Sequence, residues 1–193
     1  MTAGSNGIHA ITPFLSCPVC RSSLTPGASS LRCDLGHSFD IARQGYVSLF
    51  GGGRRANTGD SAEMVAARDR FLQRGHYERI ADVVSAVIRQ TSATEHGLIA
   101  DLAGGTGYYL ARVITGSPSP GVSIDLSVAA SRRAARALPD GLAVAADVWG
   151  RLPLADRSCS VVLSSATNTW QHSSGQWGFR AYIGSRQETY LLV

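Results

Sequence analysis

Residues 98–107 read LIADLAGGTG: a short apolar run that contains an acid, followed by a turn of glycines and other small residues. An apolar run of this length bounded by glycines is typical of a buried strand. Small residues after a strand let the backbone approach a ligand at the start of the next helix. No Gly-Lys-Ser/Thr follows, so the stretch is not a P-loop, and it is not a regular GxGxxG. It predicts a ligand site at the carboxyl end of a strand.

The elements predicted around this turn alternate between strands and helices. Further strands are predicted over residues 122–126, 142–146 and 160–164, and helices over residues 108–114 and 128–138. Before the turn, Asp60 and Glu63 resemble a capping box that opens a helix near Ser61, Gly75 ends this helix, and a second helix begins near Tyr77. Residues 1–13 show no pattern and are predicted to be a loose tail. Alternating strands and helices indicate a parallel sheet with crossover helices.

Acids end the first three predicted strands: Asp101, Asp125 and Asp147. Asp125 can accept both ribose hydroxyls of a nucleoside, and Asp147 can accept from an adenine amino group. Each acid taken singly is as often only a helix cap. Three acids in succession, with glycines after the first, match the order found in class I methyltransferases.

Four potential metal ligands lie near the N-terminus: Cys17, Cys20, Cys33 and His37. The CxxC places two sulfurs on one turn, the second pair completes a tetrahedron, and Gly36 allows the second tight turn. The alternatives are a disulfide or buried thiols, but a cytosolic chain disfavours the disulfide, and no thioredoxin-like pattern follows. The spacing favours a structural Zn²⁺ site, while Cys159 is interpreted as a small buried residue.

Composition indicates a globular chain that is mildly basic. Of 193 residues, 44% are hydrophobic and 17% charged, and the net charge is +4. All 18 basic residues are arginine, and residues 1–56 hold five of them against two acids, a balance of +3. A solvated basic surface is the simplest interpretation. With no membrane-length apolar run and no signal peptide, a cytoplasmic protein without membrane contact is expected.

At this point the motifs resemble one family, the RlmA-type 23S rRNA guanine-N1 methyltransferases, which include the macrolide-resistance form. The four potential metal ligands match its zinc ligands, and residues 39–47 (FDIARQGYV) resemble the segment that follows them. Residues 59–64 (GDSAEM), 71–72 (FL) and 75–77 (GHY) resemble the family's most distinctive stretch. The resemblance extends over about residues 15–164.

The resemblance implies S-adenosylmethionine as a cofactor, structural Zn²⁺, and 23S ribosomal RNA as partner, with a homodimer as a further expectation. It implies that Tyr77 lies beside the cofactor, that Gly105 and Thr106 line its amino-acid end, and that Asp101 and Asp125 are the loop acid and the ribose acid. The predicted cofactor-binding set is Tyr77, Asp101, Gly105, Thr106, Gly107, Asp125 and Asp147. Ala103 stands where the family often has glycine. The zinc domain and Arg21, Arg32, Arg43, Arg54 and Arg55 would hold the RNA.

The expected fold class is α/β: an incomplete class I (Rossmann-like) methyltransferase domain with an N-terminal zinc ribbon. Residues 1–56 are predicted to form the ribbon and a basic linker, residues 57–164 a partial methyltransferase domain, and residues 165–193 a divergent tail. Since the resemblance ends near residue 164, the chain is interpreted as C-terminally truncated, its activity stays open, and no catalytic base is assigned. The alternatives are a zinc-ribbon RNA-binding protein without catalysis and a small-molecule methyltransferase.

Overall fold

The computed structural model describes residues 4–51, 59–90, 97–164 and 189–192. A small sheet contains β1 (Leu24–Pro26), β2 (Ser30–Cys33) and β3 (Ser38–Asp40). A large sheet contains β4 (Tyr46–Ser48), β5 (Leu98–Leu102), β6 (Gly121–Asp125), β7 (Leu142–Ala145), β8 (Cys159–Ser164) and β9 (Thr189–Leu192). The helices are α1 (Gly4–Ile11), the 3-10 turn η1 (Thr12–Phe14), α2 (Ala62–Leu72), α3 (Glu78–Gln90), α4 (Tyr108–Ile114) and α5 (Val128–Ala137).

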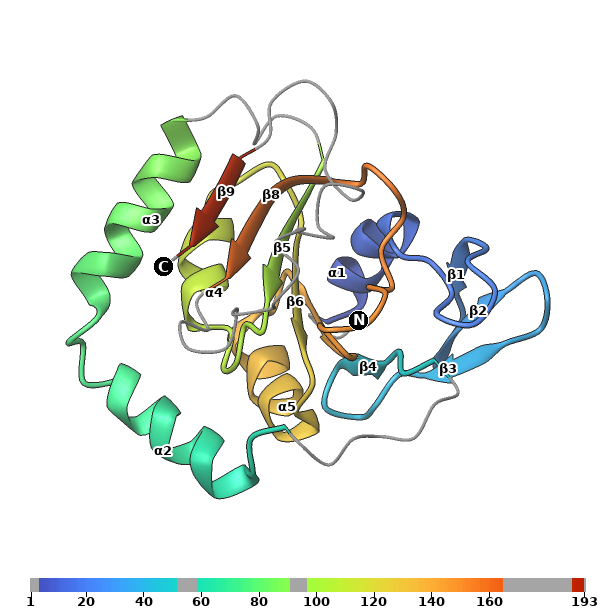
Figure 1. Ribbon diagram of the computed structural model, residues 1–193, viewed down its shortest axis with the longest axis horizontal. Helices are drawn as coiled ribbons and strands as arrows, with labels where there is room; N and C mark the ends of the chain where they lie inside the picture. The colour runs from blue at the N-terminus through green and yellow to red at the C-terminus, as the bar shows by residue number, and fades with distance from the viewer. Residues whose placement is uncertain (1–3, 52–58, 91–96, 165–188, 193) are drawn as a thin grey trace.

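The large sheet is parallel throughout and has the strand order β4-β7-β6-β5-β8-β9 (Figure 1). The small sheet is antiparallel, with the order β1-β2-β3. The strand order reverses between β5 and β8, and β5 lies in the middle. Open parallel sheets bind ligands outside the carboxyl ends of their strands at such a reversal, so the end of β5 is the expected place for a ligand. Because β6 pairs in parallel with β5, its carboxyl end lies beside this place. The predicted α/β fold with a parallel sheet is confirmed.

Both faces of the large sheet are buried, and the strand β5 illustrates this. Its five residues are all buried. Leu98, Ala100 and Leu102 belong to one core cluster, while Ile99 belongs to the other, as the two-residue period of a strand requires. A strand buried on both faces reads as a continuous apolar run, and this explains the pattern at residues 98–102.

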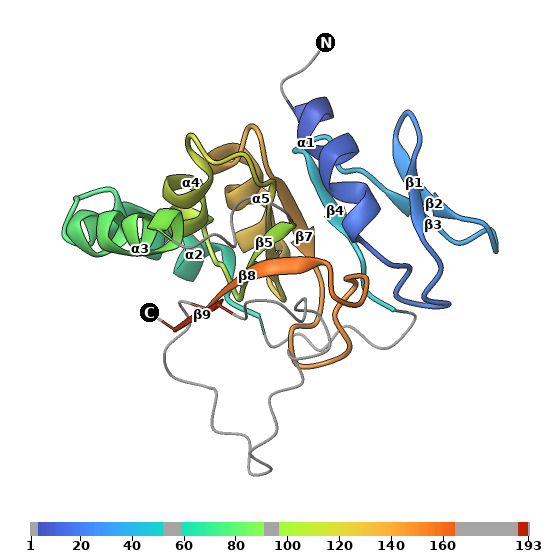
Figure 2. The same cartoon turned by 90° about the horizontal axis from the view of Figure 1, so that it is seen from above.

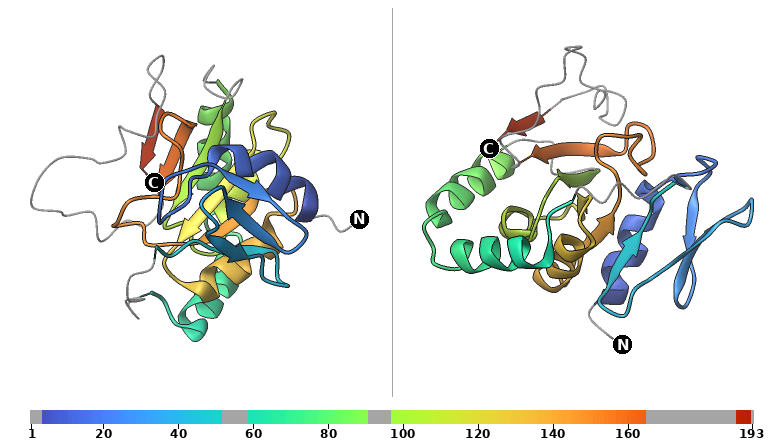
Figure 3. Two further views of the ribbon diagram at one scale, coloured as in Figure 1. Left: turned by 90° about the vertical axis from the view of Figure 1, so that its right-hand side faces the viewer. Right: turned by 60° about the horizontal axis from the view of Figure 1, so that its bottom comes forward.

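Helices cover one face of this sheet, and the N-terminal segment covers the other. The helices α4 and α5 lie on the sheet, and α3 and α2 pack outside them (Figure 2). On the other side, α1 lies beside β4, with the small sheet beyond it (Figure 3). One core cluster joins this segment to the sheet; it includes Ile8, Ile11, Cys17, Leu31, Cys33, Leu98 and Val122. The ribbon and the large sheet therefore share a core.

The prediction of a loose tail over residues 1–13 is wrong. Residues 4–11 form α1, and Ile11 is completely buried against the sheet, with Ile8 nearly so. Gly7 packs so closely on Gly141 that a Cβ at Gly7 would overlap the Gly141 carbonyl oxygen. A helix of eight residues with two glycines is too short and too irregular to give a periodic signal, so tertiary packing stabilises it.

The strand β4 was not predicted. Its residues fall within the predicted unit 1–56, yet Val47 pairs with Val144 of β7 in the large sheet and is fully buried. Three residues between turns give little periodic signal. The domain boundaries stay a prediction. All but Gly51 of the predicted linker at residues 51–55 lies outside the described residues, as does most of the predicted tail.

The start of α2 differs in one detail from the expected capping box. Ser61, not Asp60, is the N-cap: its hydroxyl accepts from the Met64 N–H at 3.3 Å and donates to Glu63 at 2.8 Å. The helix ends at Leu72 with Gln73 as its C-cap, earlier than the predicted stop at Gly75, which lies in the turn that follows and has φ +81°. No helix in the described ranges is long and apolar enough to cross a membrane.

Candidate functional site

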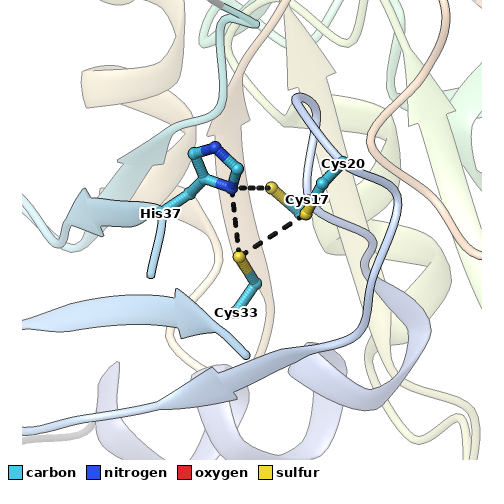
Figure 4. Close-up of side chains that lie close together, drawn as sticks. All are labelled: Cys17, Cys20, Cys33 and His37. Carbon is cyan, nitrogen blue, oxygen red and sulfur yellow. Dashed lines mark hydrogen bonds between the residues drawn. The ribbon is translucent and has the colours of Figure 1, made fainter. Parts of the chain in front are cut away.

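Three cysteines and one histidine converge between the small sheet and the turn that precedes it (Figure 4). The His37 Nδ1 atom lies 3.3 Å from Cys33 Sγ and 3.7 Å from Cys17 Sγ, and Cys20 Sγ lies 3.6 Å from Cys33 Sγ. All four potential ligand atoms lie within 4.8 Å of one another. The structure thus brings the predicted metal ligands together.

Two backbone turns present these ligands. In the first, the Arg21 N–H donates to the Cys17 carbonyl at 2.9 Å. In the second, the Gly36 N–H donates to the Cys33 carbonyl at 2.9 Å, and Gly36 has φ +85°, which favours glycine. The expectation that Gly36 permits a tight turn before His37 is confirmed.

The donor set and spacing fit zinc. Around a tetrahedral ion with Zn–S near ~2.3 Å and Zn–N near ~2.0 Å, ligand atoms are separated by about 3.5–3.8 Å, close to the distances found here. All the cysteines in the described residues are free, which excludes the disulfide. Hydrogen bonds from Ser22 lower the pKa of Cys20 to about 6, so this thiol ionises readily as a ligand must. Four protein ligands leave no open position, as in a structural site.

Arg21 links the first turn to the segment before β8 through its side chain. Its guanidinium donates to the carbonyl oxygens of Leu152 at 2.8 Å and Leu154 at 2.7 Å, and it lies 3.7 Å from the Asp156 carboxylate. Ser16 adds a hydrogen bond to Leu154 at 2.9 Å. Arg21 was expected to contact RNA, but these bonds engage its donors within the protein. Its role is to position the ribbon against the sheet.

The second cluster lies where β5 turns into α4. Asp101 is completely buried near the end of β5, and Ser123 lies beside it in β6, also buried. Gly104 folds over both, because a Cβ there would overlap Ser123 Oγ and lie 2.8 Å from Asp101 Oδ2. The sequence therefore needs glycine at residue 104 to close the loop over this carboxylate.

Asp101 has the environment of a ligand-binding acid. Among the described residues, neither its carboxylate oxygens nor Ser123 Oγ has a hydrogen-bond partner. Burial, with a smaller contribution from the charge of Asp125, raises the pKa of Asp101 to about 7. Buried polar atoms without partners are costly and rare. A bound ammonium group beside Asp101 would lower this cost, and it would also favour the ionised acid.

Asp125 ends β6 at the rim of the same loop. Its carboxylate accepts from the Gly105 N–H at 2.9 Å and from the Ser127 N–H at 2.7 Å. Burial raises the pKa of Asp125, and these two N–H donors counteract part of the rise. The structure thus brings three predicted cofactor residues, Asp101, Gly105 and Asp125, to adjacent strand ends.

The backbone conformation of the loop explains why the loop contains glycines. Gly105 has φ +57° and Gly107 has φ +78°, and Gly107 is the N-cap of α4. Ala103 has φ +54°, a left-handed conformation that favours glycine. This conformation gives a physical reason for the glycine that the resembled family often has there.

Thr106 lies in the loop itself, whereas Tyr77 lies in the turn between α2 and α3. Tyr77 precedes α3, is about one-third exposed (37%) and packs edge-on against Phe71. The pKa of Tyr109 is raised by burial first, then by Tyr77, Tyr108 and Asp101, so Tyr77 and Asp101 act on the same ring. Thr106 is buried. The place of Tyr77 beside the cofactor stays a prediction.

A groove of about 460 Å³ lies next to the loop. It runs between the α2–α3 elbow and α4, and its lining includes Leu72, Gly75, Glu78, Thr106, Tyr108 and Arg112. Asp101 and Asp125 do not line it, so its volume is not the space above the carboxylates. It adjoins the loop at Thr106.

Asp147 was predicted at the end of the third strand, but β7 ends at Ala145. The Asp147 carboxylate accepts from the Trp149 N–H at 2.9 Å, so it caps a local turn, and the residue is exposed. It lies on the loop that follows β7, and its role toward a nucleoside stays a prediction.

Sequence reasoning missed Ser123, Asp60 and Arg68. Ser123 is one small polar residue inside an apolar strand, which is common in cores. Arg68 lies on an exposed helical position, where an arginine is normally solvated. It nevertheless forms an ion pair of 2.8 Å with Asp60 and lies against Gly105. Only the long-range packing of α2 on the loop makes this arginine part of the site.

Comparison with known proteins is consistent with both the Cys/His cluster and the glycine loop. Residues 15–51 match the family described as RlmA, N-terminal, a zinc ribbon. The chain is 39% identical over 158 residues to the 23S rRNA (guanine(748)-N(1))-methyltransferase of Streptomyces fradiae, covering 80% of this chain and 55% of that protein. It is 42% identical over 172 residues to a candidate 23S rRNA (guanine-N(1)-)-methyltransferase of Micromonospora griseorubida, covering 80% of this chain and 58% of that protein. The chain therefore spans a little over half the length of these relatives.

Among solved structures, the fold is similar to a candidate S-adenosyl-L-methionine-dependent methyltransferase of Methanococcus maripaludis. The TM-score is 0.59 at 13% identity, over 72% of this chain and 68% of that one. The parallel sheet, the glycine loop and the Cys/His cluster together define a class I methyltransferase fold that carries a zinc ribbon. Its ribbon matches the RlmA N-terminal family, and over 80% of its length the chain is similar to the two 23S rRNA (guanine-N1) methyltransferases named above.

Proposed function

We propose that the protein methylates guanine N1 in a hairpin of 23S ribosomal RNA, with S-adenosylmethionine as donor. Two curated relatives carry this reaction in their names. The observation that carries the proposal is the buried carboxylate of Asp101, which has no hydrogen-bond partner in the described part of the chain, beneath a loop that Gly104 closes. Such a carboxylate fits an ammonium group, and Asp125 at the rim fits ribose hydroxyls.

The residues of this chain would hold and orient the reactants. In this proposal Asp101 would bind the amino group of the cofactor and Asp125 its ribose hydroxyls. Gly105 and Thr106 would line its amino-acid end, Tyr77 would lie beside it, and Asp147 would accept from the adenine amino group. The bound cofactor supplies a methyl group on an electrophilic sulfonium. The protein's main task is alignment of the acceptor nitrogen, which contributes strongly to rate. No described residue is assigned as the base that accepts the N1 proton.

The RNA must present its target base unpaired, because guanine N1 lies on the Watson–Crick edge. The ribbon offers Arg32 and Arg43, both exposed, for contact with phosphates, whereas Arg21 is engaged by main-chain carbonyls. Arg54 and Arg55 lie outside the described residues. Binding should weaken as salt rises, because phosphate contacts release counterions. The proposed setting is the cytoplasm, where ribosomal RNA is found.

The test combines calorimetry with a methylation assay on the full chain. S-adenosylmethionine should bind, and a 23S hairpin should gain methyl groups while free guanosine does not. Asp125→Asn should weaken cofactor binding without lowering RNA affinity, and Asp156→Asn, away from the loop, serves as the control. RNA binding without cofactor binding would instead support a non-catalytic RNA-binding protein. Equal methylation of hairpin and guanosine would support a small-molecule methyltransferase.

The homodimer stays a prediction. Sedimentation equilibrium over a range of protein concentrations tests it, because a dimer gives a mass that rises with concentration toward twice 20.3 kDa. A mass that stays at one chain throughout would contradict it.

A further inference from the structure

The glycine loop is covered by an arginine from a distant helix. Gly105 is buried, and the side chain against it is Arg68 of α2: a Cβ at Gly105 would lie 3.6 Å from Arg68 Nη1 and 4.0 Å from its Cδ. The Arg68 side chain is itself about half exposed (53%). A ligand that settles over Gly105 must therefore contact this guanidinium.

Arg68 is held over the loop by the segment that leads into α2. Gly59 packs on Ser127 so closely that a Cβ at Gly59 would lie 2.9 Å from Ser127 Cα. The Ser127 hydroxyl donates to the Asp60 carbonyl at 2.6 Å, and the Asp60 carboxylate pairs with Arg68 Nη1 at 2.8 Å. Ser127 also donates to Asp125, so one connected set of contacts links the ribose acid to Arg68.

Arg68 is the cation that lies against the loop, among three acids. After burial and its hydrogen bonds, the pKa of Asp125 is raised by Asp60 and lowered by Arg68, and Asp101 lies beneath. Two other arginines near the groove are also ion-paired, Arg112 with Glu78 and Asp82 and Arg133 with Asp69, but among the described residues only Arg68 comes within 4 Å of a Cβ placed at Gly105. S-adenosylmethionine carries one anionic group, its α-carboxylate, which the nearby acids would repel.

We propose that Arg68 binds the α-carboxylate of S-adenosylmethionine, exchanging its pairing with Asp60 for a pairing with the ligand. A guanidinium binds a carboxylate through two parallel hydrogen bonds, so it fixes orientation as well as charge. Arg68 thus makes the site selective for a cofactor with an intact amino-acid end. This assignment rests on the proposed function, in which the loop binds this cofactor.

The test measures affinity by calorimetry for two ligands, S-adenosylmethionine and its decarboxylated form. Arg68→Gln keeps most of the side chain but removes the charge, and Arg68→Lys keeps the charge. Arg70→Gln is the control, because Arg70 is an exposed arginine of the same helix. Arg68→Gln should lower the affinity for S-adenosylmethionine about 10- to 100-fold and change the affinity for the decarboxylated ligand by no more than about threefold. Arg68→Lys should recover part of the loss, and Arg70→Gln should change neither affinity.

Equal effects of Arg68→Gln on both ligands, or no effect on either, would overturn the assignment while leaving the proposed function intact. If Arg68→Gln fails to fold, as judged by thermal melting, Arg68→Lys decides: a lower affinity for S-adenosylmethionine with an unchanged affinity for the decarboxylated ligand supports the assignment, and equal effects on both ligands overturn it. If the unaltered chain binds neither ligand, the proposed function itself fails.

Discussion

Replacing Gly104 by alanine tests the packing of the loop over Asp101. The new Cβ would overlap Ser123 Oγ and lie 2.8 Å from Asp101 Oδ2 and 2.9 Å from Asp101 Cγ. Both neighbours are buried in strands, so the loop backbone has to move. Overpacking of this kind costs about 1–3 kcal/mol. For a chain of this size, about 2 kcal/mol lowers the melting temperature by about 4–8 °C.

The measurement is thermal unfolding followed by circular dichroism, with cofactor calorimetry alongside. Affinity for S-adenosylmethionine should fall, since displacement of the loop also moves the N–H that Gly105 donates to Asp125. Gly150→Ala is the matched control for stability, because Gly150, like Gly104, has no positive φ, but the nearest atom to a Cβ there lies at an ordinary contact distance of 3.5 Å. Ser123→Ala combined with Gly104→Ala should recover part of the stability, as coupled neighbours do. A Gly104→Ala chain that melts within a degree of the original would refute this account of the loop.

Four further predictions concern the ribbon and the loop. The purified chain should contain one zinc per molecule by elemental analysis, and Cys33→Ser should lose the metal and unfold at a lower temperature, because Cys33 lies in the core cluster shared with the sheet. Arg21→Ala should cost about 2 kcal/mol in thermal unfolding by removing two charge-assisted hydrogen bonds, and Arg21→Lys should recover little, because one ammonium group cannot reproduce the fork. Ala103→Gly should raise stability by about 1 kcal/mol, since φ at Ala103 is +54°, and an unchanged or lower melting temperature would contradict this. Because burial raises the pKa of Asp101 to about 7, the folded chain retains a proton that the unfolded chain releases above about pH 4. The contribution of this group to the free energy of unfolding therefore falls as the pH rises from about 4 to about 7. In denaturant titrations Asp101→Asn should remove that fall, with up to about 4 kcal/mol more stability than the original chain at pH 8 and no gain near pH 4.

The large sheet could be predicted because its central strands are buried on both faces. That burial makes residues 98–102, 122–126 and 142–146 apolar, and glycines and acids mark where they end. The metal ligands could be predicted because a CxxC followed by a second pair leaves few chemical alternatives. In both cases the local sequence itself carries the physical requirement.

Other parts of the structure depend on contacts that local sequence does not encode. The helix α1 is short and glycine-containing, and it is stabilised by burial of Ile11 against the sheet. The role of Arg68 depends on how α2 packs over the loop, and the role of Arg21 depends on two carbonyl groups about 130 residues away. An arginine in sequence gives no indication of whether its partner is a phosphate, a carboxylate or a main-chain oxygen.

The strand β4 also limits how this architecture can be rearranged. It follows the small sheet along the chain, yet it pairs with β7 at the edge of the large sheet. Removal of the ribbon together with β4, through Ser48, would leave β7 as an unprotected edge, with main-chain donors open to pairing with other chains. Chimeras that exchange ribbons between relatives should therefore be joined beyond Ser48, so that each ribbon carries its own edge strand with it.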